Sequence, residues 1–175
     1  MKMKCVFFDR DGVVNFAAPL GEYIQTPDEF EVIPAFLDAL RVVKKHGYMA
    51  VVITNQQGVG KGLYSDEDVE GIHQKLESLL QAEGLALDAV YYCPHLIKEE
   101  CDCRKPEPGM FLQAAAKWDI DLKASWMVGD NFSDVEAGAA AGCRTILVSR
   151  LAHEGATHRI DRMDDLPPLL DRTLK

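Results

Sequence analysis

The chain has 175 residues, of which 47% are hydrophobic and 27% charged, values typical of one globular domain spanning residues 1–175. The formal net charge of −9 argues against a partner such as nucleic acid or an anionic membrane surface. No apolar run approaches the ~20 residues of a membrane span, and the N-terminus becomes charged too early for a signal peptide. We therefore expect a cytoplasmic protein, and a monomer, because no feature indicates an oligomer.

Short apolar runs alternate with helical patterns along the chain. The runs predicted as buried strands are CVFF (5–8), MAVVI (49–53), AVYY (89–92), SWMV (125–128) and TILV (145–148). Signals for the starts and ends of helices lie at Pro34, Gly47, Ser65, Pro108 and Gly142. Strands that alternate with helices predict an α/β fold with a doubly wound parallel sheet. The tail after Arg150 shows no clear pattern.

Polar residues follow the predicted strands at their carboxyl ends, the edge of such a sheet where ligands bind. Asp9 and Asp11 leave the first strand two residues apart, so both carboxylates can face one site. An Asp-Gly turn alone would explain these residues equally well. Asp130 adds a third carboxylate at the same edge, where the three would repel one another without a cation. Mg²⁺ prefers such oxygen ligands, so a magnesium site is predicted.

The turn after the second strand is a candidate phosphate site. The Thr54 hydroxyl and the turn formed by Asn55, Gln56 and Gln57 can hold a phosphate oxygen, although a strand-end threonine also often satisfies its own backbone. The glycine-rich segment 58–62 does not match a P-loop, because the flanking glycine and hydroxyl positions are wrong. It is predicted as a flexible loop that brings a lysine, Lys61, near the substrate.

Lys105 precedes a proline that fixes the local backbone and gives the cation a defined position. The sequence thus offers two carboxylates, a metal site, a hydroxyl and a lysine, which are the groups that phosphoryl transfer needs. The metal and the lysine neutralise charge on the transferring group, and an aspartate can form a covalent aspartyl phosphate.

Four segments, DRDG, ITNQ, RKP and GDNFSD, occur in this order after these strands. They resemble the four motifs of the haloacid dehalogenase (HAD) superfamily of phosphatases, over about residues 4 to 150. The resemblance implies a Rossmann-like HAD core and a Mg²⁺-dependent phosphomonoester hydrolase that acts on a small phosphorylated substrate through an aspartyl phosphate.

The resemblance also implies roles for individual residues. Asp9 would be the nucleophile, and Asp11 the general acid and base. Thr54 and Lys105 would bind the phosphoryl group. Asp130 would hold Mg²⁺ together with Asp9 and the backbone carbonyl of Asp11. A further acidic residue, Asp134, would orient Lys105 or support the metal site.

A second metal site is predicted from Cys93, His95, Cys101 and Cys103, which offer three thiolates and one imidazole for tetrahedral zinc. A disulfide would leave one cysteine over and does not suit a reducing compartment, and the C-x-x-C spacing of a redox pair is absent. The segment resembles the zinc loop of the HAD branch that contains heptose 1,7-bisphosphate phosphatases and histidinol-phosphatases. As in that branch, too few residues separate the first two motifs for a large cap domain. We expect structural zinc that stiffens the loop before Arg104 and Lys105.

Within this branch, the substrate can be predicted from the side chain that meets the non-reacting part of the substrate. Arg104 is free to bind a second phosphate, which favours 7-phosphate hydrolysis of D-glycero-D-manno-heptose 1,7-bisphosphate. The stretch Gly21-Glu22-Tyr23 can instead offer Glu22 to an amine, so histidinol phosphate is the alternative substrate. A receiver-type signalling domain would not need Asp11 as an acid, and a zinc-stabilised binding module would not need every catalytic position filled.

Overall fold

The computed structural model describes residues 2–175 and contains one six-stranded sheet. Its strands are β1 (Cys5–Phe8), β2 (Met49–Asn55), β3 (Ala89–Cys93), β4 (Trp126–Gly129), β5 (Arg144–Val148) and β6 (His158–Ile160). They lie in the order β3-β2-β1-β4-β5-β6, and every neighbouring pair is parallel. The chain reverses its direction of travel across the sheet between β1 and β4. In such sheets this reversal leaves a crevice at the carboxyl ends of the strands.

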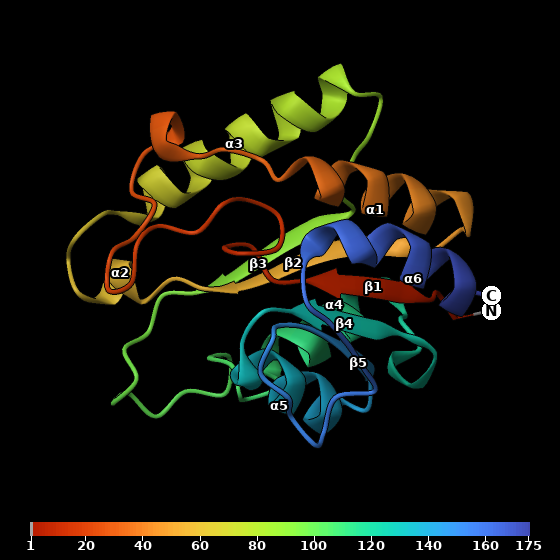
Figure 1. Cartoon of the computed structure of the whole chain (residues 1–175). Helices are drawn as coiled ribbons and strands as arrows, with labels where there is room; N and C mark the ends of the chain where they lie inside the picture. Colours follow the sequence, from red (N-terminus) through yellow and green to blue (C-terminus); the bar gives the residue numbers. More distant parts are fainter. Residues whose placement is uncertain (1) are drawn as a thin grey trace.

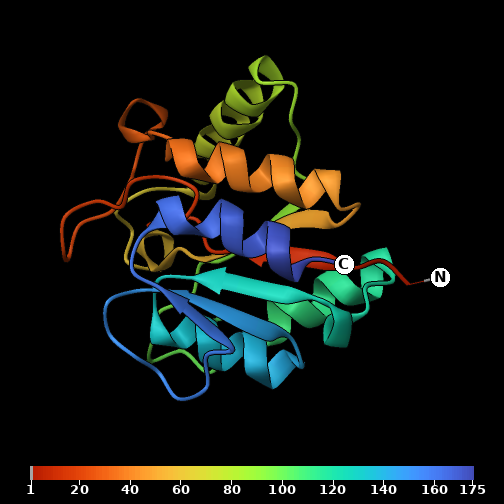
Figure 2. The ribbon, with the colours of Figure 1, turned by 45° about the vertical axis from the view of Figure 1, so that its right-hand side comes forward.

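Helices cover both faces of the sheet (Figure 1). They are α1 (Pro34–Lys45), α2 (Gln57–Gly60), α3 (Asp66–Ala82), α4 (Gly109–Trp118), α5 (Phe132–Ala141) and α6 (Leu166–Thr173). Helices α1, α3 and α6 lie on one face, with α6 alongside α1, and α4 and α5 lie on the other (Figures 1 and 2). Three 3-10 helices span Pro27–Glu29, Leu122–Ala124 and Met163–Asp165.

Strand β1 is central and buried on both faces, because its side chains alternate between two hydrophobic cores. Phe8 packs edge-on against Phe36 of α1, with ring centroids 5.2 Å apart. Phe7 packs on the opposite face against Phe111 of α4, at 4.9 Å. The two cores hold β1 rigidly, so the residues that leave its carboxyl end start from a fixed position.

The predicted doubly wound parallel sheet is confirmed, and each predicted strand agrees with the structure to within two residues. Residues 2–175 contain no large cap domain, as predicted, because the segment between β1 and α1 holds only the 3-10 helix Pro27–Glu29. Strand β6 and helix α6 lie in the tail that the sequence left unassigned. The predicted flexible loop instead begins as the short helix α2. None of the helices in residues 2–175 has the length and hydrophobicity needed to cross a membrane.

Candidate active site and metal sites

A buried lysine occupies the carboxyl edge of the sheet. The Nζ atom of Lys105 lies 2.8 Å from Asp9 Oδ1 and 2.6 Å from Asp134 Oδ1, and it donates to the Ile53 carbonyl at 3.0 Å. The Lys105 side chain is only 2% exposed. Burial opposes its charge, but the two carboxylates outweigh burial and raise the pKa of Lys105. The ammonium group is therefore charged and fixed in three directions.

Three carboxylates, Asp9, Asp130 and Asp134, gather around this lysine, and one oxygen from each lies within 4.8 Å of the others. Gly12 permits the arrangement: its φ is 91°, and a Cβ atom there would lie 2.0 Å from Asp130 Oδ2. Burial, with the charge of Asp134, raises the pKa of Asp9 and raises the pKa of Asp130 to about 6. Three carboxylates exceed the single charge of Lys105, and their oxygen atoms suit a divalent cation such as Mg²⁺.

The Asp11 carboxylate does not join this group but is held by three other side chains. Arg10 Nη2 lies 3.1 Å from both of its oxygens, Asn15 Nδ2 donates to Oδ1 at 2.9 Å, and Gln56 Nε2 donates to Oδ2 at 3.0 Å. Burial opposes ionisation of Asp11, but Arg10 and the hydrogen bonds outweigh it and hold the pKa of Asp11 below its ordinary value. The expected contribution of the Asp11 carbonyl to a metal site stays a prediction.

Arg10 is a site residue that the sequence did not reveal. Its side chain is fully buried, lies 3.3 Å from His73 Nε2 through Nη1, and sits over the Phe30 ring at 5.9 Å. Burial, with Arg10, lowers the pKa of His73 to about 4, so the neutral imidazole can accept from the guanidinium. Alternation along a strand would place Arg10 opposite Asp11. The turn that begins after β1 ends this alternation and lets the two residues pair.

Lys105 and the four aspartates around it line one polar cavity of about 260 Å³. Its lining residues are Asp9, Asp11, Thr54, Asn55, Arg104, Lys105, Asp130, Asn131, Ser133 and Asp134. The Asn55 side chain pairs with the Lys105 backbone through two hydrogen bonds of 3.0 Å, one in each direction. Asn131 and Ser133 are additional lining residues that the sequence analysis did not select.

The predicted zinc ligands also lie together. His95 Nδ1 is 3.3 Å from Cys93 Sγ and 3.2 Å from Cys103 Sγ, and Cys93 Sγ is 3.8 Å from Cys101 Sγ. Tetrahedral zinc with Zn–S bonds of about 2.3 Å places its sulfur ligands ~3.8 Å apart, which matches Cys93 and Cys101. Cys93 Sγ and Cys103 Sγ lie closer, at 2.8 Å, so zinc binding would separate them; the three thiols and one imidazole are the types of ligand that zinc takes. All five cysteines are free thiols.

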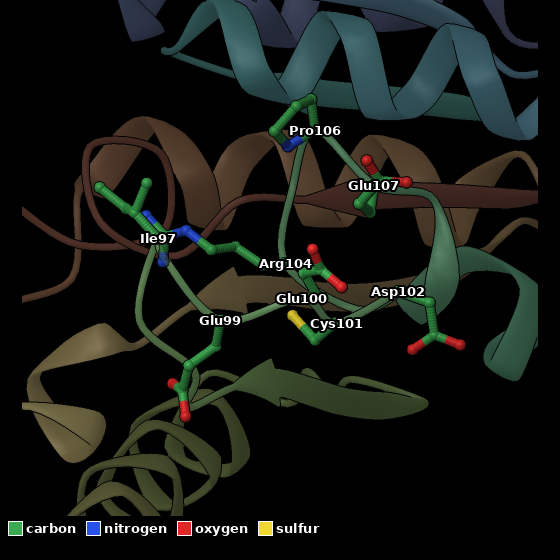
Figure 3. Close-up of a pocket in the computed structure, with 8 residues that line it drawn as sticks. All are labelled: Ile97, Glu99, Glu100, Cys101, Asp102, Arg104, Pro106 and Glu107. Carbon is green, nitrogen blue, oxygen red and sulfur yellow. The ribbon is translucent and has the colours of Figure 1, made fainter.

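The same loop lines a second cavity of about 520 Å³ (Figure 3). Arg104 lines both cavities. Its side chain extends toward Ile97 (Figure 3), and Nη1 donates to the His95 carbonyl at 3.4 Å. A guanidinium at this position can meet an anionic group that lies outside the polar cavity.

Residues 102–167 match the HAD-hydrolase-like family. Over 98% of its length the chain is 38% identical to the D-glycero-beta-D-manno-heptose-1,7-bisphosphate 7-phosphatase of Haemophilus influenzae, covering 99% of that protein. Over its whole length it is 36% identical to all of the Vibrio cholerae protein of the same name. The chain belongs to this phosphatase family. The solved D,D-heptose 1.7-bisphosphate phosphatase from B. bronchiseptica, complexed with magnesium and phosphate, is similar with a TM-score of 0.86. It is 32% identical, and the match covers 97% of this chain and 99% of that one.

Membership of the HAD superfamily, which the four motifs implied, is thus confirmed. For this phosphatase the structure brings Thr54, Asn55 and Arg104 into the polar cavity, beside the aspartates and Lys105. The other residues predicted to bind substrate do not line that cavity: Gln56 is buried, Gln57 and Tyr23 bond to each other, and Gly21 and Glu22 are exposed.

Helix α2 accounts for the position of Tyr23. The Tyr23 hydroxyl accepts from Gln57 Nε2 at 3.0 Å and from Lys61 Nζ at 2.8 Å. The Lys61 ammonium also lies 5.2 Å from the centre of the Tyr23 ring. Gln57 and Lys61 therefore tie the segment before α1 to the turn after β2.

Proposed function

We propose that residues 1–175 form one Mg²⁺-dependent phosphatase domain that removes the 7-phosphate of D-glycero-β-D-manno-heptose 1,7-bisphosphate. The observation that carries this proposal is the buried Lys105 ammonium, paired with Asp9 and Asp134 in a polar cavity that Thr54 also lines. A fixed cation beside a carboxylate suits phosphoryl transfer, because it neutralises charge on the transferring group. The family of the chain supports the choice of substrate.

In the first step Asp9 attacks the phosphorus atom of the 7-phosphate. A bond forms between an Asp9 carboxylate oxygen and phosphorus, and the bond from phosphorus to the sugar oxygen breaks. Asp11 gives a proton to that oxygen, and the sugar 1-phosphate leaves as an alcohol. In the second step water attacks the aspartyl phosphate and gives a proton to Asp11. Inorganic phosphate leaves, and the Asp9 carboxylate is restored.

The contacts of Asp11 fit the base of the second step directly. Arg10, Asn15 and Gln56 hold it as a carboxylate, and that form can accept a proton from water. The acid role in the first step requires a protonated Asp11. Protonation of Asp11 therefore accompanies a weakening of its pair with Arg10, which is fully buried behind the polar cavity and does not line it.

Two metals would complete the site. Asp9 and Asp130 would hold Mg²⁺, with the Asp11 carbonyl as a further ligand, and the bound ion would neutralise phosphoryl charge. Cys93, His95, Cys101 and Cys103 would hold structural zinc. Free thiols at that position suit the cytoplasmic location expected from the sequence.

The substrate assignment depends on Arg104 and is tested through it. Arg104 lines both cavities. When the reacting 7-phosphate is bound by Lys105, the Arg104 guanidinium therefore remains available for the 1-phosphate. Wild-type protein should have a higher kcat/KM for the heptose bisphosphate than for histidinol phosphate. Arg104→Ala should lose ~1.5–3 kcal/mol of transition-state stabilisation for the bisphosphate alone, the range for a hydrogen bond to a charged group.

Arg172→Ala is the matched control, because Arg172 is exposed on α6 and does not line the polar cavity. It should leave both values of kcat/KM unchanged. If the wild-type protein has a higher kcat/KM for histidinol phosphate than for the heptose bisphosphate, the enzyme is a histidinol-phosphatase instead.

A further inference from the structure

One buried side-chain amide contacts two different parts of the site. Gln56 Nε2 lies 2.9 Å from Thr54 Oγ1 and 3.0 Å from Asp11 Oδ2. The other end of the amide, Oε1, accepts a hydrogen bond of 2.7 Å from the Tyr64 hydroxyl. Gln56 is 1% exposed and Tyr64 is 7% exposed, so water does not replace these contacts.

The neighbours of Gln56 fix which end of the amide faces the site. Both Asp11 oxygens already accept from Arg10, and a carboxylate without a proton is an acceptor only. The opposite orientation would place Gln56 Oε1 at 3.0 Å from Asp11 Oδ2, with no proton between the two oxygens. The nitrogen therefore faces Asp11, and its second N–H donates to Thr54.

Tyr64 completes this arrangement from the other side. Burial raises the pKa of Tyr64 to about 12, so its hydroxyl keeps its proton and donates to Gln56 Oε1. The approach of the tyrosine depends on Gly58 in α2, where a Cβ atom would lie 2.0 Å from Tyr64 Cε1. A glycine of the segment that resembled a phosphate loop thus makes room for the tyrosine ring.

The Thr54 hydroxyl is oriented as a consequence. Its oxygen accepts from Gln56, and no hydrogen bond within residues 2–175 uses the Thr54 hydroxyl as a donor. Thr54 lines the polar cavity, so its hydroxyl proton is free to point into that cavity. A hydroxyl held in this way is a donor prepared for an anionic oxygen.

We infer that Tyr64 and Gln56 are positioning residues, which act in series to aim the Thr54 hydroxyl at a phosphoryl oxygen. This inference rests on the proposed phosphatase function, because it assigns Thr54 to the phosphoryl group. Neither Tyr64 nor Gln56 needs to touch the substrate. Without them the Thr54 hydroxyl rotates freely, and the entropy lost on ordering it lowers the affinity for the ligand.

A double-mutant cycle tests the inference with inorganic phosphate as the probe. The affinity for phosphate is measured by calorimetry, with magnesium present, on wild type, Tyr64→Phe, Thr54→Val and the double variant. Tyr64→Phe should weaken phosphate binding about tenfold in wild type, the effect of roughly one hydrogen bond. It should weaken binding less than about twofold in the Thr54→Val background, where no hydroxyl remains to be aimed.

Tyr48→Phe is the matched control, because Tyr48 is a buried tyrosine, 4% exposed, whose hydroxyl donates to the Lys175 carbonyl at 3.2 Å. It should leave phosphate affinity unchanged. If Tyr64→Phe does not fold, judged by thermal unfolding, Gln56→Met removes the same link and enters the same cycle.

Equal losses of phosphate affinity in the wild-type and Thr54→Val backgrounds would mean that Tyr64 has only a structural role. No loss of affinity in wild type would mean that Tyr64 does not aim the Thr54 hydroxyl. Either result overturns the inference. The cycle contains no sugar, so it is independent of the proposed substrate. A wild-type protein that fails to hydrolyse the heptose bisphosphate but shows the coupling would refute the substrate and retain the positioning role.

Discussion

Replacing Lys105 by methionine should destabilise the protein strongly, because it removes the only cation that residues 2–175 pair with the acidic cluster. Asp9 and Asp134 lie 2.8 and 2.6 Å from the ammonium group, and the Asp134 side chain is 2% exposed. Methionine has a similar length and fills the same space without charge. The three carboxylates of Asp9, Asp130 and Asp134 would then lie close together with no counterion.

The size of the effect follows from the cost of an uncompensated buried charge. Removing one partner of a buried ion pair destabilises a protein by about 3–5 kcal/mol. With a urea m-value of roughly 2 kcal/mol/M, this loss lowers the unfolding midpoint by ~1.5–2.5 M. The variant Lys105→Met with Asp134→Asn should recover part of the loss, because it leaves two carboxylates in the cluster instead of three.

Urea unfolding in metal-free buffer, followed by tryptophan fluorescence, measures this change. Metal must be absent because a bound cation would replace part of the missing charge. Lys123→Met is the matched control: Lys123 is exposed and its side chain makes no ion pair within residues 2–175, so the midpoint should stay close to that of wild type. If Lys105→Met unfolds at the same urea concentration as Lys123→Met, the carboxylates do not depend on this cation.

Three further predictions concern the chemistry and the metals. Asp9→Asn should abolish turnover without changing the circular dichroism spectrum, because an amide cannot attack phosphorus; near-native rates would contradict the covalent step. Magnesium affinity, measured by calorimetry, should fall about tenfold per pH unit below pH 6. Burial and Asp134 raise the pKa of Asp130 to about 6, so a proton competes with the metal there, and a flat profile would contradict this. Elemental analysis of protein purified without added metal should find about one zinc ion per chain, mostly lost in Cys103→Ser; a disulfide with little zinc would refute the site.

The parallel sheet could be predicted because its strands leave a strong local signal. Strands such as β1 and β4 are buried on both faces, so they appear as unbroken apolar runs between helices. Strand β6 has only three residues, HRI, none of them fully buried, and α6 carries two prolines in its first turn. Neither segment shows the periodicity that identifies an element. Their positions are set by packing against β5 and α1 rather than by their own composition.

The chemistry of the site was predictable where it depends on the ends of strands, and less so where it depends on side-chain pairing. Asp9 and Asp130 follow adjacent strands, so the fold alone places them together. Asp11 was expected beside them, yet its carboxylate turns to Arg10, a pair that forms only because the chain bends after β1. Gln56 follows β2 like a substrate-binding residue, but its amide is already bonded to Asp11, Thr54 and Tyr64. Local spacing does not encode these choices between partners.

The loop before Lys105 contributes unequally to the positions of the Arg104 and Lys105 side chains. The Lys105 backbone is held by both hydrogen bonds of the Asn55 amide, and its ammonium by Asp9, Asp134 and Ile53. These contacts do not involve the proposed zinc ligands. The guanidinium of Arg104, in contrast, has a single protein hydrogen bond among residues 2–175, at 3.4 Å to the carbonyl of His95, a proposed zinc ligand.

From the sequence we expected zinc to stiffen the loop before Arg104 and Lys105, whereas these contacts tie Arg104 more closely than Lys105 to that loop. Lys105 is held by contacts with β2 and α5, which would remain if the loop loosened. Arg104 follows the loop itself, because its one contact moves with His95. In the proposed mechanism Lys105 serves the phosphoryl group that reacts, and Arg104 serves the phosphate that remains. If these proposed roles hold, the loop that carries Cys93, His95, Cys101 and Cys103 would govern which substrate is accepted more than how fast a bound phosphoryl group is transferred.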